Sequence, residues 1–328
     1  MSPRRIDTAM ARKRPEKNYI RNEWVKIVKN IQEKRSDTGV PLYVTLSGRE
    51  GKDIDCLIKH GILEQTETGA IRDKDTWKVV AIEKNGPAAT ELRRKFPGLD
   101  VRNDDVLDLI CGPGEISYPN SDNEDEIKLW KASVVNLDYD SSLKMTLEGR
   151  SVRFGVIQTL KKISAIQNEC TSGEWYIFLT LNATLNFGAE HWNYIKETLN
   201  DNLRQVPRFR DDFFTKIIVQ KGLTQIEDSI ITNIKSCSSL QQKLLLSLVP
   251  KLLAQKTRDH MWAISVNQSF MYGDNADNGA RMTSWIINFK KPLNSKINTD
   301  DQCYKQNVSG ILANTVRLDS KGKPHPLK

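Results

Sequence analysis

The 328-residue sequence has few cysteines and histidines, and it has no long apolar run. Its five cysteines and four histidines are scattered without a CxxC pair, so it lacks the clustered spacing typical of a zinc site or a disulfide framework. No stretch approaches the roughly 18 apolar residues of a membrane span. No apolar segment follows the basic residues 1–5, so no secretory signal is expected. We therefore expect a cytoplasmic protein with reduced thiols, without a metal site and without a membrane partner.

Positive charge is what the sequence has in excess. The 49 Lys and Arg residues outnumber the 41 Asp and Glu residues and give a net charge of +8. Basic residues gather near both ends, at Arg4, Arg5, Arg12, Lys13, Arg14, Lys17, Lys321, Lys323 and Lys328, whereas residues 115–126 are acidic. A basic protein attracts polyanions, so the expected partner is nucleic acid bound through the basic termini. The alternative is that both termini are only solvated ends. The oligomeric state is left open.

The order of strand-like and helix-like segments predicts the fold of the first half. Strands are expected at residues 41–47, 78–83, 99–102, 132–138 and 175–181, and helices at residues 18–33, 53–59, 87–96 and 151–168. Residues 111–125 have the composition of a loop. Strands separated by helices of this length indicate βαβ units, a parallel sheet and right-handed crossovers.

The second half has a different pattern. Helices are expected at residues 192–203, 223–234 and 240–254, with Pro250 kinking or ending the last one. Two strand-like segments follow, residues 261–272 and 281–289, and a polar loop joins them as a hairpin. The predicted fold class is therefore α/β, with a Rossmann-like, mainly parallel sheet, helices on both faces and a C-terminal antiparallel hairpin.

The predicted domain organisation has three parts. Residues 1–16 form a basic disordered tail, residues 17–290 form one domain, and residues 291–328 form a C-terminal tail. Within the domain, residues 188–256 are a helical insertion between the fifth strand and the hairpin.

Candidate ligand-binding residues follow three successive strands. Gly48 and Gly51 lie in the loop after the first strand, where a doubly wound sheet binds its ligand. Glu83 ends the second strand, where a carboxylate accepts hydrogen bonds from ribose hydroxyls, and Asp104 and Asp105 follow the third. Each feature alone is explained by a tight turn or a solvated acid. Together they indicate a ligand that contains adenosine.

Four segments resemble, in order, the first four motifs of class I S-adenosylmethionine-dependent methyltransferases: SGREGKDI, VVAIEKN, VRNDDVLDL and SVVNLDYD. The hairpin at residues 261–289 resembles that family's last two strands. The resemblance implies S-adenosylmethionine as cofactor. By the same resemblance, its binding residues would be Ser47, Gly48 and Gly51 at the methionine part, Glu83 at the ribose, Asp104 or Asp105 at the adenine, and Asn136 beside the methyl group.

The resemblance also implies that residues 136–140 face the methyl acceptor. Methyl transfer needs in-line positioning and, for an NH or OH acceptor, removal of a proton. Asp138 would accept a hydrogen bond from that group, and Tyr139 would stack on a planar substrate. The alternative is that Asp138 caps a turn and Tyr139 belongs to the core.

Three functions fit these features to different degrees. The first is an S-adenosylmethionine-dependent methyltransferase with nucleic acid as the candidate acceptor. The second is a catalytically inactive binding or regulatory module of the same fold. It is favoured by a first motif without the acid and third glycine of ExGxGxG, and by a fourth motif without a Pro-Pro pair. The third is an NAD-dependent oxidoreductase, in which the ribose-binding acid follows the first glycine by about 20 residues. Here Glu83 follows Gly48 by 35 residues.

Overall fold

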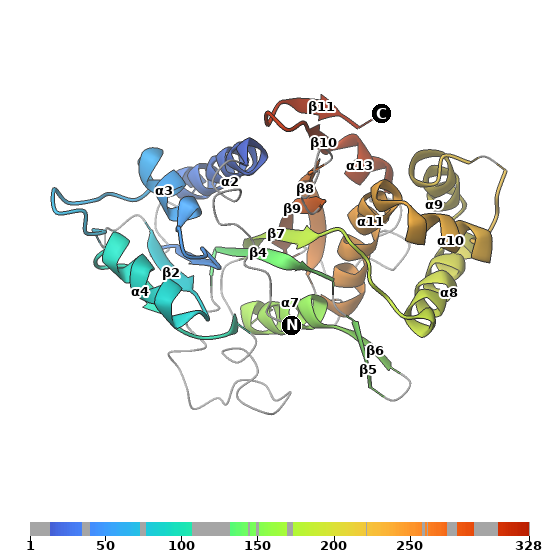
Figure 1. The fold of residues 1–328 in the computed structure, drawn as a ribbon, viewed down its shortest axis with the longest axis horizontal. Coiled ribbons are helices and arrows are strands. Elements are labelled where there is room, and N and C mark those ends of the chain that lie inside the picture. Colours follow the sequence, from blue (N-terminus) through green and yellow to red (C-terminus); the bar gives the residue numbers. More distant parts are fainter. Residues whose placement is uncertain are drawn as a thin grey trace, which may run out of the picture.

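The computed structural model describes residues 14–34, 40–72, 77–106, 132–143, 145–148, 151–168, 173–220, 222–257, 260, 262–273, 281–291 and 308–327. Within these ranges the main sheet has nine strands in the order β11-β10-β8-β9-β7-β4-β1-β2-β3 (Figure 1). The strands are β1 (Leu42–Thr45), β2 (Lys78–Ile82), β3 (Asp100–Arg102), β4 (Val134–Ser142), β7 (Glu174–Asn182), β8 (Ala263–Tyr272), β9 (Met282–Lys290), β10 (Thr315–Leu318) and β11 (Pro324–Pro326). A separate hairpin pairs β5 (Met145–Glu148) with β6 (Ser151–Phe154).

The direction of the strands confirms the predicted fold class. β3, β2, β1, β4 and β7 pair in parallel. β9 runs antiparallel to β7 on one side and to β8 on the other. The second strand of the hairpin, β9, therefore lies next to β7, and the first strand, β8, lies beyond it. The antiparallel strand expected at residues 281–289 is confirmed as β9, but it is not the last strand of the sheet, because β10 and β11 follow it. An antiparallel strand inserted at this place departs from the 3-2-1-4-5-6 order of dinucleotide-binding sheets.

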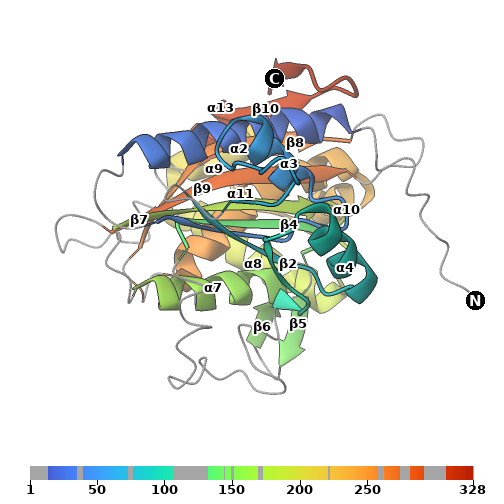
Figure 2. The same ribbon diagram turned by 90° about the vertical axis from the view of Figure 1, so that its left-hand side faces the viewer.

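Helices cover both faces of the sheet (Figure 2). One face carries α2 (Pro15–Lys34), α3 (Lys52–Lys59) and α4 (Gly86–Lys95), whose apolar side chains form one buried cluster with the strands. The other carries α7 (Gly155–Asn168), α8 (Ala189–Gln205), α9 (Pro207–Asp212), the π-helix η1 (Phe213–Ile217), α10 (Asp228–Ser236), α11 (Ser238–Thr257) and α13 (Val308–Ala313). Val134 belongs to the first cluster and Val135 to the second, as the two-residue period of a strand requires.

Two predicted helices begin later than their sequence pattern indicates. Residues 151–154 form β6, and α7 begins only at Gly155. The alternation of polar and apolar residues in SVRF suits a strand, and pairing with β5 satisfies its backbone. Residues 223–227 precede α10, which begins at Asp228.

Pro250 neither ends nor shortens its helix. α11 continues through it to Thr257, although proline removes one helical hydrogen bond. Leu246, Leu253 and Pro250 itself are buried where α11 packs against α7 and the sheet. Tertiary packing of this kind supplies most of the stability of a helix in a protein, and it outweighs the lost bond.

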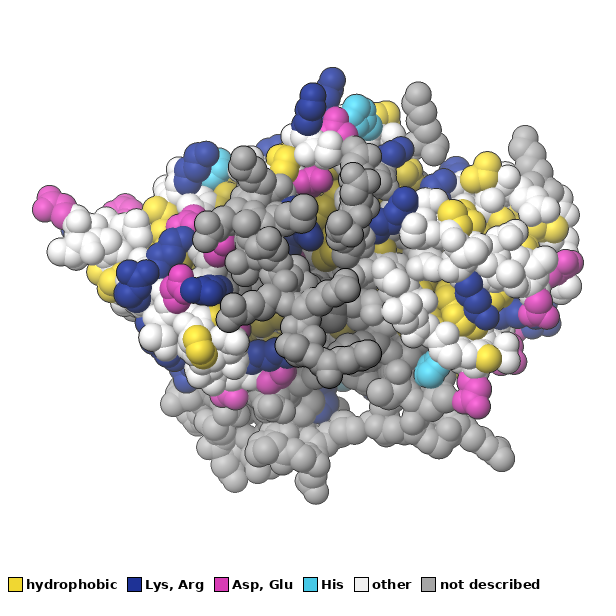
Figure 3. All heavy atoms as spheres, in the orientation of Figure 1, with side chains coloured by type: hydrophobic (Ala, Val, Ile, Leu, Met, Phe, Trp, Pro, Cys, Tyr) yellow, Lys and Arg dark blue, Asp and Glu magenta, His cyan; other side chains and the backbone are white. Residues whose placement is uncertain are grey.

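The C-terminal residues 308–327 belong to the sheet and are not a separate tail, because β10 pairs in parallel with β8. The turn that follows β10 lies on the first residue of α2: a Cβ atom placed on Gly322 would be only 2.7 Å from the backbone oxygen of Pro15. Lys and Arg side chains stand at this end of the molecule (Figure 3). The expected loop at residues 111–125, the polar loop of the hairpin and residues 1–13 of the basic tail lie outside the described residues.

None of the helices in the described ranges combines the length and the apolar character that crossing a membrane requires.

Candidate functional site

The loop after β1 contains two glycines with different tasks. Gly48 and Gly51 both have a positive φ, 60° and 55°, and the amide of Gly51 donates to the carbonyl of Gly48 at 3.2 Å. A Cβ atom on Gly51 would lie 2.5 Å from Cε2 of Phe96, so glycine is needed there to pack α3 against α4. A Cβ atom on Gly48 would meet nothing within 4 Å. The loop is therefore open on the side of Gly48.

The acids predicted for the second and third strands lie at neighbouring strand ends. Glu83 directly follows β2, is half-buried, and its Oε1 accepts from the amide of Asn85 at 2.8 Å. Asn103, which follows β3, donates from Nδ2 to the carbonyl oxygen of Glu83 at 2.9 Å. Asp104 is exposed, and the carboxylate of Asp105 lies 3.6 Å from Nζ of Lys84. Because β2 and β3 are parallel, these carboxylates share the edge of the sheet at which Gly48 lies.

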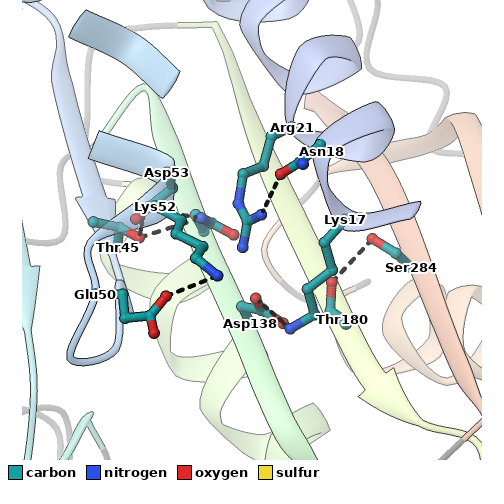
Figure 4. A network of polar contacts seen from close by, with 11 residues as sticks. Lys17, Asn18, Arg21, Thr45, Glu50, Lys52, Asp53, Asp138, Thr180 and Ser284 are labelled. Carbon is teal, nitrogen blue, oxygen red and sulfur yellow. Dashed lines mark hydrogen bonds and ion pairs between the residues drawn. The ribbon is translucent and has the colours of Figure 1, made fainter. Parts of the chain in front are cut away.

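A buried carboxylate that sequence reasoning missed lies beside the first strand. Asp53, in the first turn of α3, is only 6% exposed. The hydroxyl of Thr45 donates to its Oδ2, and Nδ2 of Asn136 donates to both, at 3.3 Å to Asp53 and 3.2 Å to Thr45 (Figure 4). Burial raises the pKa of the Asp53 carboxyl group, and the hydrogen bond from Thr45 and the charge of Arg21 partly oppose this. The predicted residue Asn136 is therefore one member of a buried polar network.

Four buried polar atoms around this network have no hydrogen-bond partner in the described part of the chain. They are Nε of Arg21, Oγ of Ser47, Oδ1 of Asp53 and Oδ1 of Asn136. A buried polar atom without a partner costs about 1–3 kcal/mol, and such atoms are rare in folded proteins. Three of the four accept hydrogen bonds, and the fourth belongs to a guanidinium group. They suit a ligand that brings an ammonium group and a carboxylate.

Asp138 lies two residues after Asn136 on β4 and faces α2, the helix that carries Arg21. Nζ of Lys17 lies 3.0 Å from Oδ1 and 2.9 Å from Oδ2 of Asp138, and both side chains are 16% exposed. Lys17 and Arg21 both reach from α2 toward the ends of β1 and β4 (Figure 4). On the neighbouring strand, Thr180 pairs in register with Asp138 and donates from its hydroxyl to Oγ of Ser284 at 3.0 Å. Polar side chains thus replace apolar ones on this face at the carboxyl ends of the strands.

Tyr139 lies on the opposite face from Asp138. Neighbouring residues of a strand point to opposite sides, and Tyr139 packs against the apolar cluster that contains α7. Burial raises the pKa of the Tyr139 hydroxyl, and the negative charge of Asp105 raises it further. The structure therefore brings Asp138 together with Asn136, and Tyr139 together with Asp105. It does not bring Asp138 and Tyr139 to one place.

Asp53 supplies a carboxylate where the first strand itself has none. β1 ends at Thr45, a neutral polar residue. Asp53, which the next helix supplies, bonds to Thr45 and fills the same region with a carboxylate. One signal was available: Asp53 and Leu57 are four residues apart, so an acid interrupts the apolar side of a short helix. Lys17 and Arg21 carry no such signal, because they look like ordinary polar residues of an amphipathic helix.

No protein-family model and no curated protein matches the sequence. Among solved structures, the plantazolicin methyltransferase BamL, in complex with a desmethylPZN analog and SAH, is 9% identical; the match covers 84% of this chain and 87% of that one, with a TM-score of 0.39. Trm1 from Pyrococcus horikoshii, in complex with S-adenosyl-L-methionine, is also 9% identical; this match covers 89% of this chain and 58% of Trm1, with a TM-score of 0.41. A putative class I S-adenosylmethionine-dependent methyltransferase from Listeria monocytogenes is 7% identical, with coverages of 93% and 65% and a TM-score of 0.38.

Proposed function

We propose that this protein is an S-adenosylmethionine-dependent methyltransferase whose acceptor presents an NH or OH group, with nucleic acid as the candidate acceptor. The observation that carries the proposal is the order of groups along one edge of the sheet. Unpartnered atoms suited to an amino acid lie at β1 and β4, and carboxylates suited to a nucleoside lie at β2 and β3. S-adenosylmethionine is an amino acid joined to adenosine, so both ends of one molecule match this edge.

The residues present fit this cofactor. Its ammonium group would be held by Oδ1 of Asp53, Oδ1 of Asn136 and Oγ of Ser47, and its carboxylate by the guanidinium group of Arg21. Glu83 would accept hydrogen bonds from the ribose hydroxyls, and Asp104 or Asp105 one from the adenine amino group. When bound, the cofactor supplies a methyl group already activated by its sulfonium. The chain itself then needs to orient the acceptor and hold or move its proton.

Asp138 is the residue we assign to the acceptor. It lies next after Asn136 on the same face of β4, and its carboxylate is turned toward α2. A carboxylate there accepts a hydrogen bond from an NH or OH group, which orients the lone pair, and it can take the proton. Tyr139 remains a candidate for contact with the substrate through the other face, near Asp105.

The proposal of a nucleic-acid acceptor is supported by the charge at the two ends of the chain. The turn that contains Gly322 lies against Pro15, so the backbone beside Lys321 and Lys323 is close to the first turn of α2. That turn also carries Lys17, which reaches the site. A surface of one charge raises the local concentration of polyanions. A bound phosphate backbone would therefore lie next to Asp138.

Isothermal titration tests the cofactor assignment. Wild type should bind S-adenosylmethionine and S-adenosylhomocysteine but not NAD. Glu83→Ala should weaken both by at least about tenfold, because a hydrogen bond to a charged group is worth about 1.5–3 kcal/mol. The matched control is Glu67→Ala, which removes an exposed acid in the segment between α3 and β2. Binding of NAD alone would favour an oxidoreductase. Binding of S-adenosylmethionine without transfer to total RNA, DNA or protein would favour the inactive module.

A further inference from the structure

Lys17 presents an amine to the carboxylate that we assign to the methyl acceptor. Its Nζ lies at 2.9 and 3.0 Å from the two oxygens of Asp138. Both side chains are 16% exposed, so the pair is largely withdrawn from water. An exposed ion pair contributes about 0–1 kcal/mol, and for a largely buried pair the cost of desolvation offsets much of the attraction between the charges. Stability therefore gives little reason for a lysine at this place.

The local structure gives no reason either. Lys17 is the third residue of α2, where the positive end of the helix dipole disfavours a cation. Its position on the helix nevertheless places it beside a residue of the site. Lys17 and Arg21 are four residues apart, so their side chains lie next to each other on one face of α2. Arg21 is the residue that would hold the cofactor carboxylate. One helix face thus carries a cofactor anchor and, one turn away, an amine on the acceptor carboxylate.

We propose that the protein methylates its own Lys17, a reaction that rests on the function proposed above. The Lys17 ammonium first loses a proton, through Asp138 to water. The neutral amine then attacks the methyl carbon of S-adenosylmethionine; an N–C bond forms, the S–C bond breaks, and its electron pair stays on sulfur as S-adenosylhomocysteine. The methylated amine leaves the transfer step as a secondary ammonium group, because the positive charge passes from sulfur to nitrogen, so it can still pair with Asp138. Lys17 is the intramolecular case of an alkyl amine acceptor.

The test incubates the full-length protein with methyl-tritiated S-adenosylmethionine and no other acceptor. Label should appear on the peptide that contains Lys17, with a rate per molecule that does not change with protein concentration. Lys17→Arg should abolish it, and Asp138→Asn should slow it by about 10²-fold or more. Lys26→Arg is the matched control, because Lys26 is on the same helix but its side chain is 69% exposed. That variant should be labelled like wild type.

A second measurement needs no turnover. Lys17 and Lys26 are acetylated with an amine-reactive reagent, and the extent at each is read by mass spectrometry. S-adenosylhomocysteine should protect Lys17 and leave Lys26 unchanged. Calorimetric binding of S-adenosylhomocysteine without protection or methylation of Lys17 would overturn this inference and leave the proposed function standing. The absence of any binding would remove both. Labelling of Lys17 that accelerates with protein concentration would overturn the intramolecular reaction.

Discussion

At the scale of single residues, Asp53 shows a conflict between stability and binding. Its carboxylate is buried beside Thr45 and Asn136, and one of its oxygens has no hydrogen-bond partner in the described chain. We expect Asp53→Asn to raise the free energy of unfolding at pH 7 by roughly 1–2 kcal/mol, because the variant removes a buried charge and its neutral amide still accepts the bond from Thr45. The same variant should bind S-adenosylmethionine more weakly. Urea denaturation and calorimetry measure the two effects, with the exposed Asp55→Asn as control.

The pH dependence of this effect has a definite sign. Burial raises the pKa of Asp53 in the folded state, so the folded protein binds this proton more tightly than the unfolded chain. Below the ordinary pKa of aspartate, about 3.9, wild type and Asp53→Asn should be equally stable. As the pH rises through the folded-state pKa, wild type should lose stability relative to the variant. A stability difference that stays constant from pH 3 to pH 7 would contradict this account.

Asp138 provides the second prediction at this scale. Asp138→Asn should leave the affinity for S-adenosylmethionine nearly unchanged and depress kcat by about 10²–10⁴-fold, because an amide cannot take the acceptor's proton. Asp228→Asn, on an aspartate that is 87% exposed in the helical insertion, is the control and should retain full turnover. The tritiated-methyl assay measures both. If Asp138→Asn turned over at the wild-type rate, Asp138 would have no role in proton transfer, and the proposed methyltransferase activity would be unaffected.

At the scale of elements, the two glycines of the β1–α3 loop make a matched pair. Both have a positive φ, so alanine should cost about 1–2 kcal/mol at either position. At Gly51 the new methyl group also collides with Phe96, which should add about 1–3 kcal/mol from overpacking. Urea denaturation should therefore show Gly51→Ala to be the less stable variant. Gly48→Ala should fold well and bind S-adenosylmethionine more weakly, because its methyl group enters the open side of the loop.

Most helices and strands could be predicted from local sequence patterns. Which strands lie next to each other in the sheet could not. β2 and α4 follow from an apolar run and from a proline near the helix start, both readable in KVVAI and GPAATELRRK. No local pattern tells that β9 enters the sheet between β7 and β8, because an apolar strand suits any central position. The same holds for the site. Gly48 and Glu83 follow strands and Asn136 lies within one, so local patterns make them candidates, whereas Lys17 meets Asp138 across 121 residues of sequence.

At the scale of the whole molecule, the charge at the two ends predicts how binding to nucleic acid depends on salt. The logarithm of the affinity should fall by about 0.7–0.9 per phosphate contacted for each tenfold rise in salt. Because α2 begins at Pro15, the truncation that spares the fold removes residues 1–13, which include Arg4, Arg5, Arg12 and Lys13. This truncation should flatten the dependence, measured by fluorescence anisotropy with labelled RNA. An equal slope before and after truncation would show that the segment is only a solvated end.

The contact between the turn after β10 and Pro15 also orders events during synthesis. During translation α2 leaves the ribosome early. The turn that covers its first residue is translated about 300 residues later, because it contains Gly322 and α2 begins at Pro15. Until β10 joins β8, the first turn of α2, with Lys17 one turn before Arg21, lacks this neighbour. Domains fold as their residues emerge, so the central strands can pair before that moment. The contact that covers the first turn of α2 therefore forms only after residues 315–322 have been made. A ribosome-bound fragment that ends before residue 308 would have the central strands but would lack this contact beside Lys17.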